Sequence, residues 1–111
     1  HGEMQIFEAN VVGDRLHVDL TGPQPLSRQG AVYILTAIDA FSRFLTCVPI
    51  RNKTALTVAN ALVEHVFLPQ GCYQSIVSDQ GGEFCNELLG AITQVLGIRK
   101  LRTTAYRPTI S

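Results

Sequence analysis

The feature that most constrains the fold is a short apolar run that ends in a carboxylate, breaks at two glycines and resumes at helical spacing. It occupies Ser75–Phe84. Ile76 and Val77 favour a β-strand, and Gly81-Gly82 favours a loop. The apolar residues that follow recur on one helical face, at Phe84, Leu88, Ala91, Ile92 and Val95. The pattern predicts a strand, a turn and a helix, with Asp79 at the end of the strand.

A second carboxylate occupies a similar place earlier in the chain. Asp19 lies within the short apolar run His17–Leu20, which Gly22-Pro23 stops. An acid inside an apolar strand costs desolvation energy unless it is paired or bound to a metal. Asp79 has a simpler alternative explanation: an aspartate before Gly-Gly can serve only to form the turn, because its side chain accepts hydrogen bonds from nearby backbone amides. Two carboxylates at strand ends could together hold Mg²⁺ or Mn²⁺, which prefer oxygen ligands.

The remaining pattern predicts an α/β domain with a five-stranded mixed sheet and flanking helices, preceded by a leader at residues 1–14 with an irregular strand around Ile6–Val12. The first three strands form an antiparallel meander because their connections are short. A nearly continuous apolar run predicts that the second strand is central and covered on both faces, and Pro49 either places the third strand at an edge or marks its end. A rigid loop from Gly22 to Gly30 separates the first two. These strands are Arg15–Leu20, Ala31–Ile38 and Phe44–Ile50.

Two helices alternate with the last two strands. The first helix begins after the N-cap Thr54 and ends before Pro69. A strand at Gln74–Ser78 follows, then a helix at Glu83–Leu96 that closes on Gly97, and a fifth strand at Ile98–Thr103. A strand that follows a helical crossover runs parallel to its neighbour. If Gln74–Ser78 pairs with the first strand, Asp19 and Asp79 lie side by side at the carboxyl ends, where ligands of such sheets collect.

The charge balance gives no global field that would attract nucleic acid, because nine basic residues offset nine acidic ones. An apolar share of 46% excludes a disordered chain. Basic residues cluster only near the C-terminal end of the sequence. A solvent-exposed edge strand and a phosphate-binding segment explain this cluster equally well. The candidate nucleic-acid contacts there are Arg99, Lys100, Arg102, Tyr106 and Arg107.

Cysteine usage indicates an intracellular protein with reduced thiols. Cys47, Cys72 and Cys85 are odd in number and lack close-pair spacing, so neither a disulfide framework nor a zinc site is indicated. We expect them to be small packing residues. The histidines, His17 among them, form no ligand pair with these cysteines. No run reaches membrane-spanning length, and a soluble protein without a membrane partner is expected.

Five segments in order resemble the catalytic core of retroviral and gypsy-type retrotransposon integrases, within the ribonuclease H-like superfamily. The similarity covers about residues 15–111, the expected domain, and the order of the segments makes it specific. They are His17–Pro23, Tyr33–Leu35 with Ile38–Arg43, Val77–Phe84, Leu96–Ile98 and Thr103–Pro108. Two residues depart from the family pattern, since Arg107 replaces its usual histidine and Ala105 its usual proline.

The resemblance implies an Asp, Asp, Glu triad that binds two Mg²⁺ or Mn²⁺ ions, with Asp19 as the first acid and Asp79 as the second. No other cofactor is implied. It also implies water as the nucleophile in 3′-end processing of element DNA and the freed 3′-hydroxyl in strand transfer into target DNA, hence a nuclear location. Family cores commonly dimerise through helices, so a homodimer is expected.

The third acid of the family lies roughly 35 residues beyond the second, at about position 115. Glu83 and Glu87 do not match it, because both belong to the helix directly after Asp79. We therefore expect a core that lacks its C-terminal helices and is inactive by itself. Two alternatives are a decayed or domesticated element domain that binds nucleic acid or protein, and a different ribonuclease H-like nuclease.

Overall fold

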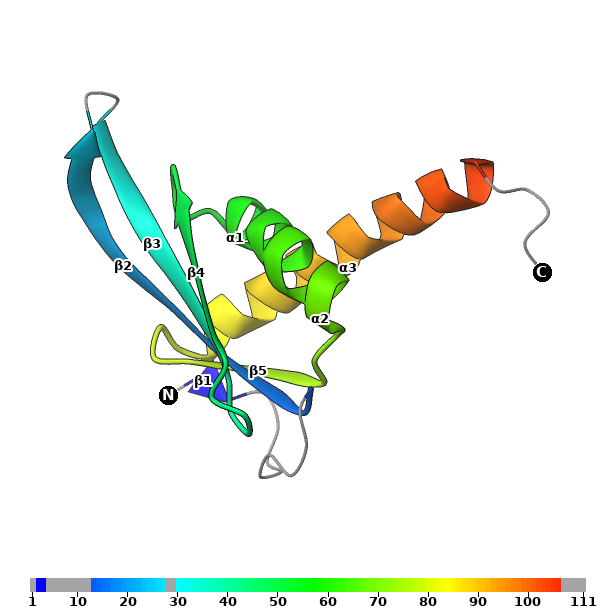
Figure 1. The fold of residues 1–111 in the computed structure, drawn as a ribbon, viewed down its shortest axis with the longest axis horizontal. Helices are drawn as coiled ribbons and strands as arrows, with labels where there is room; N and C mark the ends of the chain where they lie inside the picture. Colours follow the sequence, from blue (N-terminus) through cyan, green and yellow to red (C-terminus); the bar gives the residue numbers. More distant parts are fainter. Residues whose placement is uncertain (1, 4–12, 28–29, 107–111) are drawn as a thin grey trace.

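A mixed β-sheet runs through the computed structural model, which describes residues 2–3, 13–27 and 30–106 (Figure 1). The strand order is β1-β5-β2-β3-β4. Strands β2, β3 and β4 form the expected antiparallel meander, and β5 pairs with β2 in parallel, as the crossover predicted. The two-residue β1 adds an antiparallel edge beside β5. The bounds are Gly2–Glu3 for β1, Arg15–Ser27 for β2, Gly30–Asp39 for β3, Leu45–Ile50 for β4 and Ser75–Ser78 for β5.

Two long helical segments pack against this sheet (Figure 1). The first is continuous through α1 (Ala55–Leu62), the π-helical η1 (Val63–Phe67) and α2 (Leu68–Gln70). It begins at the predicted N-cap, where the Thr54 side chain accepts a hydrogen bond from Thr57 N. The second is α3, Gly82–Tyr106. Among the described residues, no helix has both the length and the apolar character needed to cross a bilayer.

The helices cover one face of the sheet. Buried residues alternate along β2 and β3, with Leu16, Val18, Leu35 and Ala37 in the same core as α1 and α3. Their neighbours on the opposite face are only half-buried. The expectation that Ala31–Ile38 is covered on both faces is therefore wrong for the described part of the chain. Pro49 does lie on an edge strand, because β4 ends the sheet order.

The predicted fifth strand at Ile98–Thr103 is wrong, because α3 continues through it to Tyr106. Gly97 is not the end of the helix, although glycine costs about 1 kcal/mol inside one. The residues after it include Arg99, Lys100 and Leu101. All three are strong helix formers, and their preference outweighs the β-branched Ile98.

The predicted rigid loop from Gly22 to Gly30 is also wrong, since β2 continues to Ser27 and pairs Gln24 with Val32. The ladder shifts register on both sides of Gln24, as expected where a strand contains prolines. Parallel pairing with β5 reaches only His17. Beyond that point one side of β2 is an edge, where a residue without an N–H group is tolerated.

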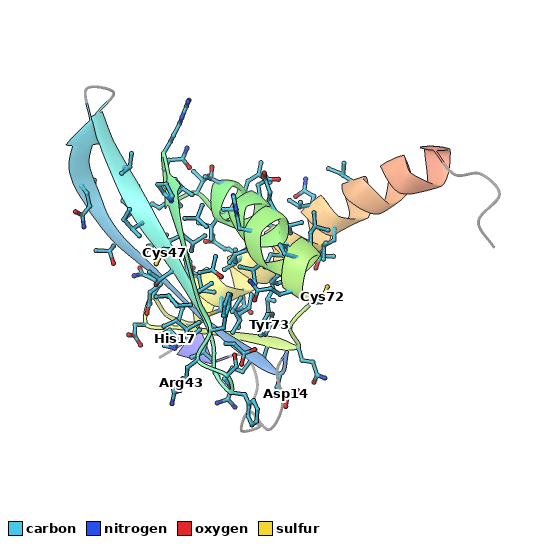
Figure 2. All side chains as sticks on the ribbon, viewed as in Figure 1. Asp14, His17, Arg43, Cys47, Cys72 and Tyr73 are labelled. Carbon is cyan, nitrogen blue, oxygen red and sulfur yellow. The ribbon has the colours of Figure 1, made fainter. Side chains whose placement is uncertain are left out.

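The three cysteines form no disulfide, as expected, but only one of them is buried. Cys85 is buried, and burial raises the pKa of its thiol. Cys47 and Cys72 are exposed, so the expectation of packing residues is wrong for both. Figure 2 labels them on separate elements, β4 and the loop before β5. The predicted irregular strand at Ile6–Val12 lies outside the described residues.

Replacing Leu88 with alanine is expected to lower the free energy of unfolding by about 3 kcal/mol, within the usual range of about 2 to 5 for buried leucines. Leu88 is fully buried on the face of α3 that packs against the sheet. Urea unfolding monitored by circular dichroism measures the change. Gln94→Ala, an exposed site on the same helix, is the control and should change stability by less than about 0.5 kcal/mol. A similar small change for Leu88→Ala would refute the packing of this face.

Candidate functional site

Asp19 and Asp79 meet at one end of the only parallel strand pair among the described residues. The β2–β5 register pairs Arg15 with Ser75 and His17 with Val77. Continued by two residues, it brings Asp19 opposite Asp79. The backbone N–H of Asp79 donates to Asp19 Oδ1 at 3.4 Å, and the Ser78 hydroxyl donates to the same oxygen at 3.5 Å. The two acids therefore come together as the sequence predicted.

His17 joins this pair. Residues two apart on a strand point to the same face, and His17 Nε2 lies 2.8 Å from Asp19 Oδ2, a hydrogen-bond distance. The side chains of His17 and Asp19 are 35% and 30% exposed, so both are reachable from solvent. Figure 2 shows His17 close to where β1, β5 and β2 lie together. Sequence reasoning missed His17 because it compared the histidines with the cysteines; the two-residue spacing to Asp19 is the signal that could have found it.

The three side chains form a cluster whose chemistry suits a divalent cation. One ligand atom each from His17, Asp19 and Asp79 can be chosen so that all lie within 4.8 Å of one another. Two carboxylates supply the oxygen donors that Mg²⁺ and Mn²⁺ prefer. It is the single such group of three or more His, Cys, Asp or Glu residues in the described part of the chain.

Asp39 is a different kind of carboxylate, since it is only 2% exposed and fully engaged in hydrogen bonds. Its Oδ1 accepts from the backbone N–H groups of Phe41 and Ser42, each at 2.8 Å. Its Oδ2 accepts from Gly13 N at 3.2 Å and from the Tyr73 hydroxyl at 2.8 Å. Asp39 thus joins the β3–β4 turn to segments before β2 and before β5.

The pKa values of this network follow from its geometry. Burial alone would raise the pKa of Asp39, but the hydrogen bonds from Ser42, Tyr73, Gly13 and Phe41 stabilise the anion and hold its pKa below the ordinary value. Burial, and then the nearby Asp39 carboxylate, raise the pKa of Tyr73. Asp39 is therefore a charged structural group, and Tyr73 stays a neutral donor.

An apolar hollow of about 400 Å³ lies over the same network, lined by Ser42, Phe44, Gln70 and Tyr73. None of the carboxylates or histidines of the His17 cluster lines it. We therefore assign the candidate chemistry to the cluster and not to the hollow.

Four of the five residues that the sequence suggested as nucleic-acid contacts lie on the end of α3 and not at the cluster. The backbone positions Arg99, Lys100, Arg102 and Tyr106 belong to the last part of α3, which Figure 1 shows projecting away from the sheet. Arg107 lies outside the described residues. Glu83 and Glu87, in the first turns of α3, are exposed and do not belong to the metal-ligand cluster.

Comparison with known proteins gives a consistent result. Residues 9–108 match the model of a family described as the integrase core domain. The chain is 36% identical over 84% of its length to the retrovirus-related Pol polyprotein from transposon 412 of Drosophila melanogaster. It is 34% identical over 89% of its length to the Gag-Pol polyprotein of Feline leukemia virus and 30% identical, again over 89%, to the Pol polyprotein of Radiation murine leukemia virus (strain Kaplan). It spans only 8%, 6% and 17% of those three polyproteins, respectively.

Proposed function

Because this chain belongs to the integrase core domain family of retroviral and transposon Pol polyproteins, we propose that its parent protein is a DNA integrase that uses Mg²⁺ or Mn²⁺. The proposed reactions are 3′-end processing of element DNA and strand transfer into target DNA. Residues 15–111 would supply most of the catalytic core, to whose sheet β1 (Gly2–Glu3) adds an edge strand. The DNA partners are the element ends and the target, in the nucleus, and the core works as a homodimer.

The observation that carries the proposal is the meeting of Asp19 and Asp79 at the ends of adjacent parallel strands. Both carboxylates would hold the metal. A bound divalent ion supplies activation of the attacking oxygen and stabilisation of charge that develops at phosphorus. The retained pair of acids gives no support to a decayed binding domain.

The chain's own contribution is to position the carboxylates. Two donors, Ser78 Oγ and Asp79 N, reach Asp19 Oδ1 at 3.4–3.5 Å, and Thr36 Oγ1 donates to the Asp19 backbone carbonyl at 3.4 Å. These contacts come from β3 on one side of β2, and from β5 and the residue that follows it on the other. Asp19 is therefore held from both sides while its carboxylate stays accessible to solvent.

We further propose that a glutamate supplied by the parent protein completes the ligand set, at about position 115 as the family spacing implies. The bases Arg99, Lys100, Arg102 and Arg107, with Tyr106, are proposed to contact DNA. Such contacts hold phosphates without reading sequence.

Millimolar Mg²⁺ or Mn²⁺ is expected to raise the melting temperature of the 111-residue chain. Free ion at ten times its Kd would add about 1.4 kcal/mol, or about 4 °C or more for a domain of this size. Differential scanning fluorimetry with and without the ion measures the shift. Asp19→Asn and Asp79→Asn should remove it, and the exposed-site control Glu64→Gln should retain it. An equal shift in all four proteins would mean that the ion binds elsewhere.

A further inference from the structure

The cluster contains a nitrogen donor that the carboxylate scheme does not use. His17 Nε2 is one of three ligand atoms that can be chosen within 4.8 Å of one another. It lies on the same face of β2 as Asp19, two residues away, and is partly open to solvent. We infer that His17 is a direct nitrogen ligand for a divalent transition-metal ion at this site, giving it one imidazole and two carboxylate donors. This inference rests on the proposed function for the metal site itself.

The distance between His17 Nε2 and Asp19 Oδ2 is compatible with coordination of one ion by both atoms. Donor atoms at neighbouring corners of an octahedral ion lie about 3 Å apart when each bond is about 2.1 Å long. His17 Nε2 and Asp19 Oδ2 are 2.8 Å apart. One ion can therefore bind both atoms with little movement of either side chain, once the ring proton has moved from Nε2 to Nδ1, because an Nε2–H that donates to Oδ2 cannot bind a metal. Figure 2 labels His17 on the sheet, and β5 ends at Ser78, one residue before Asp79.

The hydrogen bonds to Asp19 favour coordination of one ion by His17 and Asp19. Asp19 Oδ1 is the oxygen that accepts from Asp79 N and Ser78 Oγ, whereas Oδ2 faces His17. The carboxylate is thus oriented with one oxygen toward β5 and the other toward the imidazole.

The chemical consequence is metal selectivity. Mg²⁺ takes oxygen ligands and keeps several waters, so an imidazole adds little to its binding. Transition-metal ions accept imidazole nitrogen, with affinities that rise from Mn²⁺ onward in the first row. His17 is therefore expected to strengthen Mn²⁺ binding and to leave Mg²⁺ binding almost unchanged.

The test uses the whole 111-residue chain with Mn²⁺ alone, and separately Mg²⁺ alone, as probes. Pulsed electron paramagnetic resonance of bound Mn²⁺ detects a directly coordinated nitrogen, and the signal of free Mn²⁺ gives the Kd. In the wild type we expect nitrogen coupling. In His17→Gln the coupling should vanish and the Mn²⁺ Kd should rise about tenfold or more. Tenfold is the smallest loss of metal affinity that is typical when a residue supporting a ligand is replaced, and loss of a ligand itself should cost at least as much. By calorimetry the Mg²⁺ Kd should change less than about threefold, since Mg²⁺ takes oxygen ligands.

His65→Gln is the matched control, because His65 is an exposed histidine on η1 and not part of the cluster. It should keep both the coupling and the Kd values. Three results would overturn the inference: no nitrogen coupling in the wild type, coupling that survives in His17→Gln, or equal losses of Mn²⁺ and Mg²⁺ affinity. Mn²⁺ that binds without nitrogen coupling but is released by Asp79→Asn would overturn the role of His17 alone. Mn²⁺ binding unaffected by Asp19→Asn and Asp79→Asn would instead count against the proposed metal site.

Discussion

Strand transfer is expected from a chain extended through the next ~40 residues of the parent, about the length of two helices, and not from the 111 residues alone. Among the described residues, only two carboxylates reach the cluster, and the proposed third ligand lies beyond them. The absence of one ligand from a two-metal site should cost several kcal/mol of transition-state stabilisation, on the order of a thousandfold in rate. The assay joins a labelled element-end DNA to a target duplex in the presence of Mn²⁺.

Asp19→Asn and Asp79→Asn in the extended chain should each lower the rate by about a thousandfold or more, because each removes a negative ligand and keeps the size of the side chain. Glu64→Gln, on the exposed side of η1, is the control and should retain full rate. Equal, robust activity from the short and extended chains would contradict the proposal, as would an extended chain that tolerates both aspartate substitutions.

Asp39→Asn is expected to lower the free energy of unfolding by about 2 to 4 kcal/mol, because it leaves a buried donor unpaired and removes the charge that strengthens the remaining hydrogen bonds. Both carboxylate oxygens accept hydrogen bonds, and the partners of Oδ2 are Gly13 N and the Tyr73 hydroxyl. With the amide oxygen in place of Oδ1, the NH₂ replaces Oδ2: the Tyr73 hydroxyl can accept from it, but the Gly13 N–H is left unpaired, at about 1–3 kcal/mol. Urea unfolding at neutral pH measures the loss.

A smaller substitution gives a graded control for Asp39. Tyr73→Phe removes one donor and leaves the others, so it should cost about 1 kcal/mol. If Asp39→Asn costs no more than Tyr73→Phe, then neither the charge of Asp39 nor the Gly13 N–H donor contributes as the structure indicates.

The same network gives a pH dependence with a defined sign. The folded pKa of Asp39 is below its ordinary value of 3.8, so the native state favours the ionised form. Its contribution to stability is complete above pH 3.8 and is lost as the pH falls through the lower folded pKa. The difference in unfolding free energy between wild type and Asp39→Asn should therefore be constant from neutral pH to about pH 5 and shrink on further acidification. A difference that grew in acid would contradict a lowered pKa.

The placement of Asp19 beside Asp79 could be predicted because it depends on few and strong rules. Short connections make a meander, a helical crossover makes a parallel pair, and a two-residue period fixes which face a side chain occupies. The observed parallel pairing of β2 with β5 agrees with these rules, whereas the register that sets His17 opposite Val77 comes from the structure. The Thr54 cap was equally local, because one side chain and one amide define it.

The failures occurred where local preferences compete. Gly97 and the β-branched Ile98 suggested an end to the helix, but the good helix formers after them continue it. Pro23 and Pro25 suggested a loop, but an open strand edge tolerates them. The link of Asp39 to Tyr73, 34 residues later, depends on tertiary packing that no local pattern contains.

The β2–β5 pairing ends before the acids begin. The last backbone pair of β2 and β5 is His17 with Val77, whereas Asp19 and Asp79 each lie two residues further along the chain. Two long hydrogen bonds to Asp19 Oδ1, from Ser78 Oγ at 3.5 Å and from Asp79 N at 3.4 Å, join the strand ends there in place of the sheet ladder. A cation bound between Asp19 and Asp79 would hold the two strand ends together, as ladder hydrogen bonds do in the rest of the sheet. Metal binding and the association of the end of β5 with β2 would therefore be thermodynamically coupled.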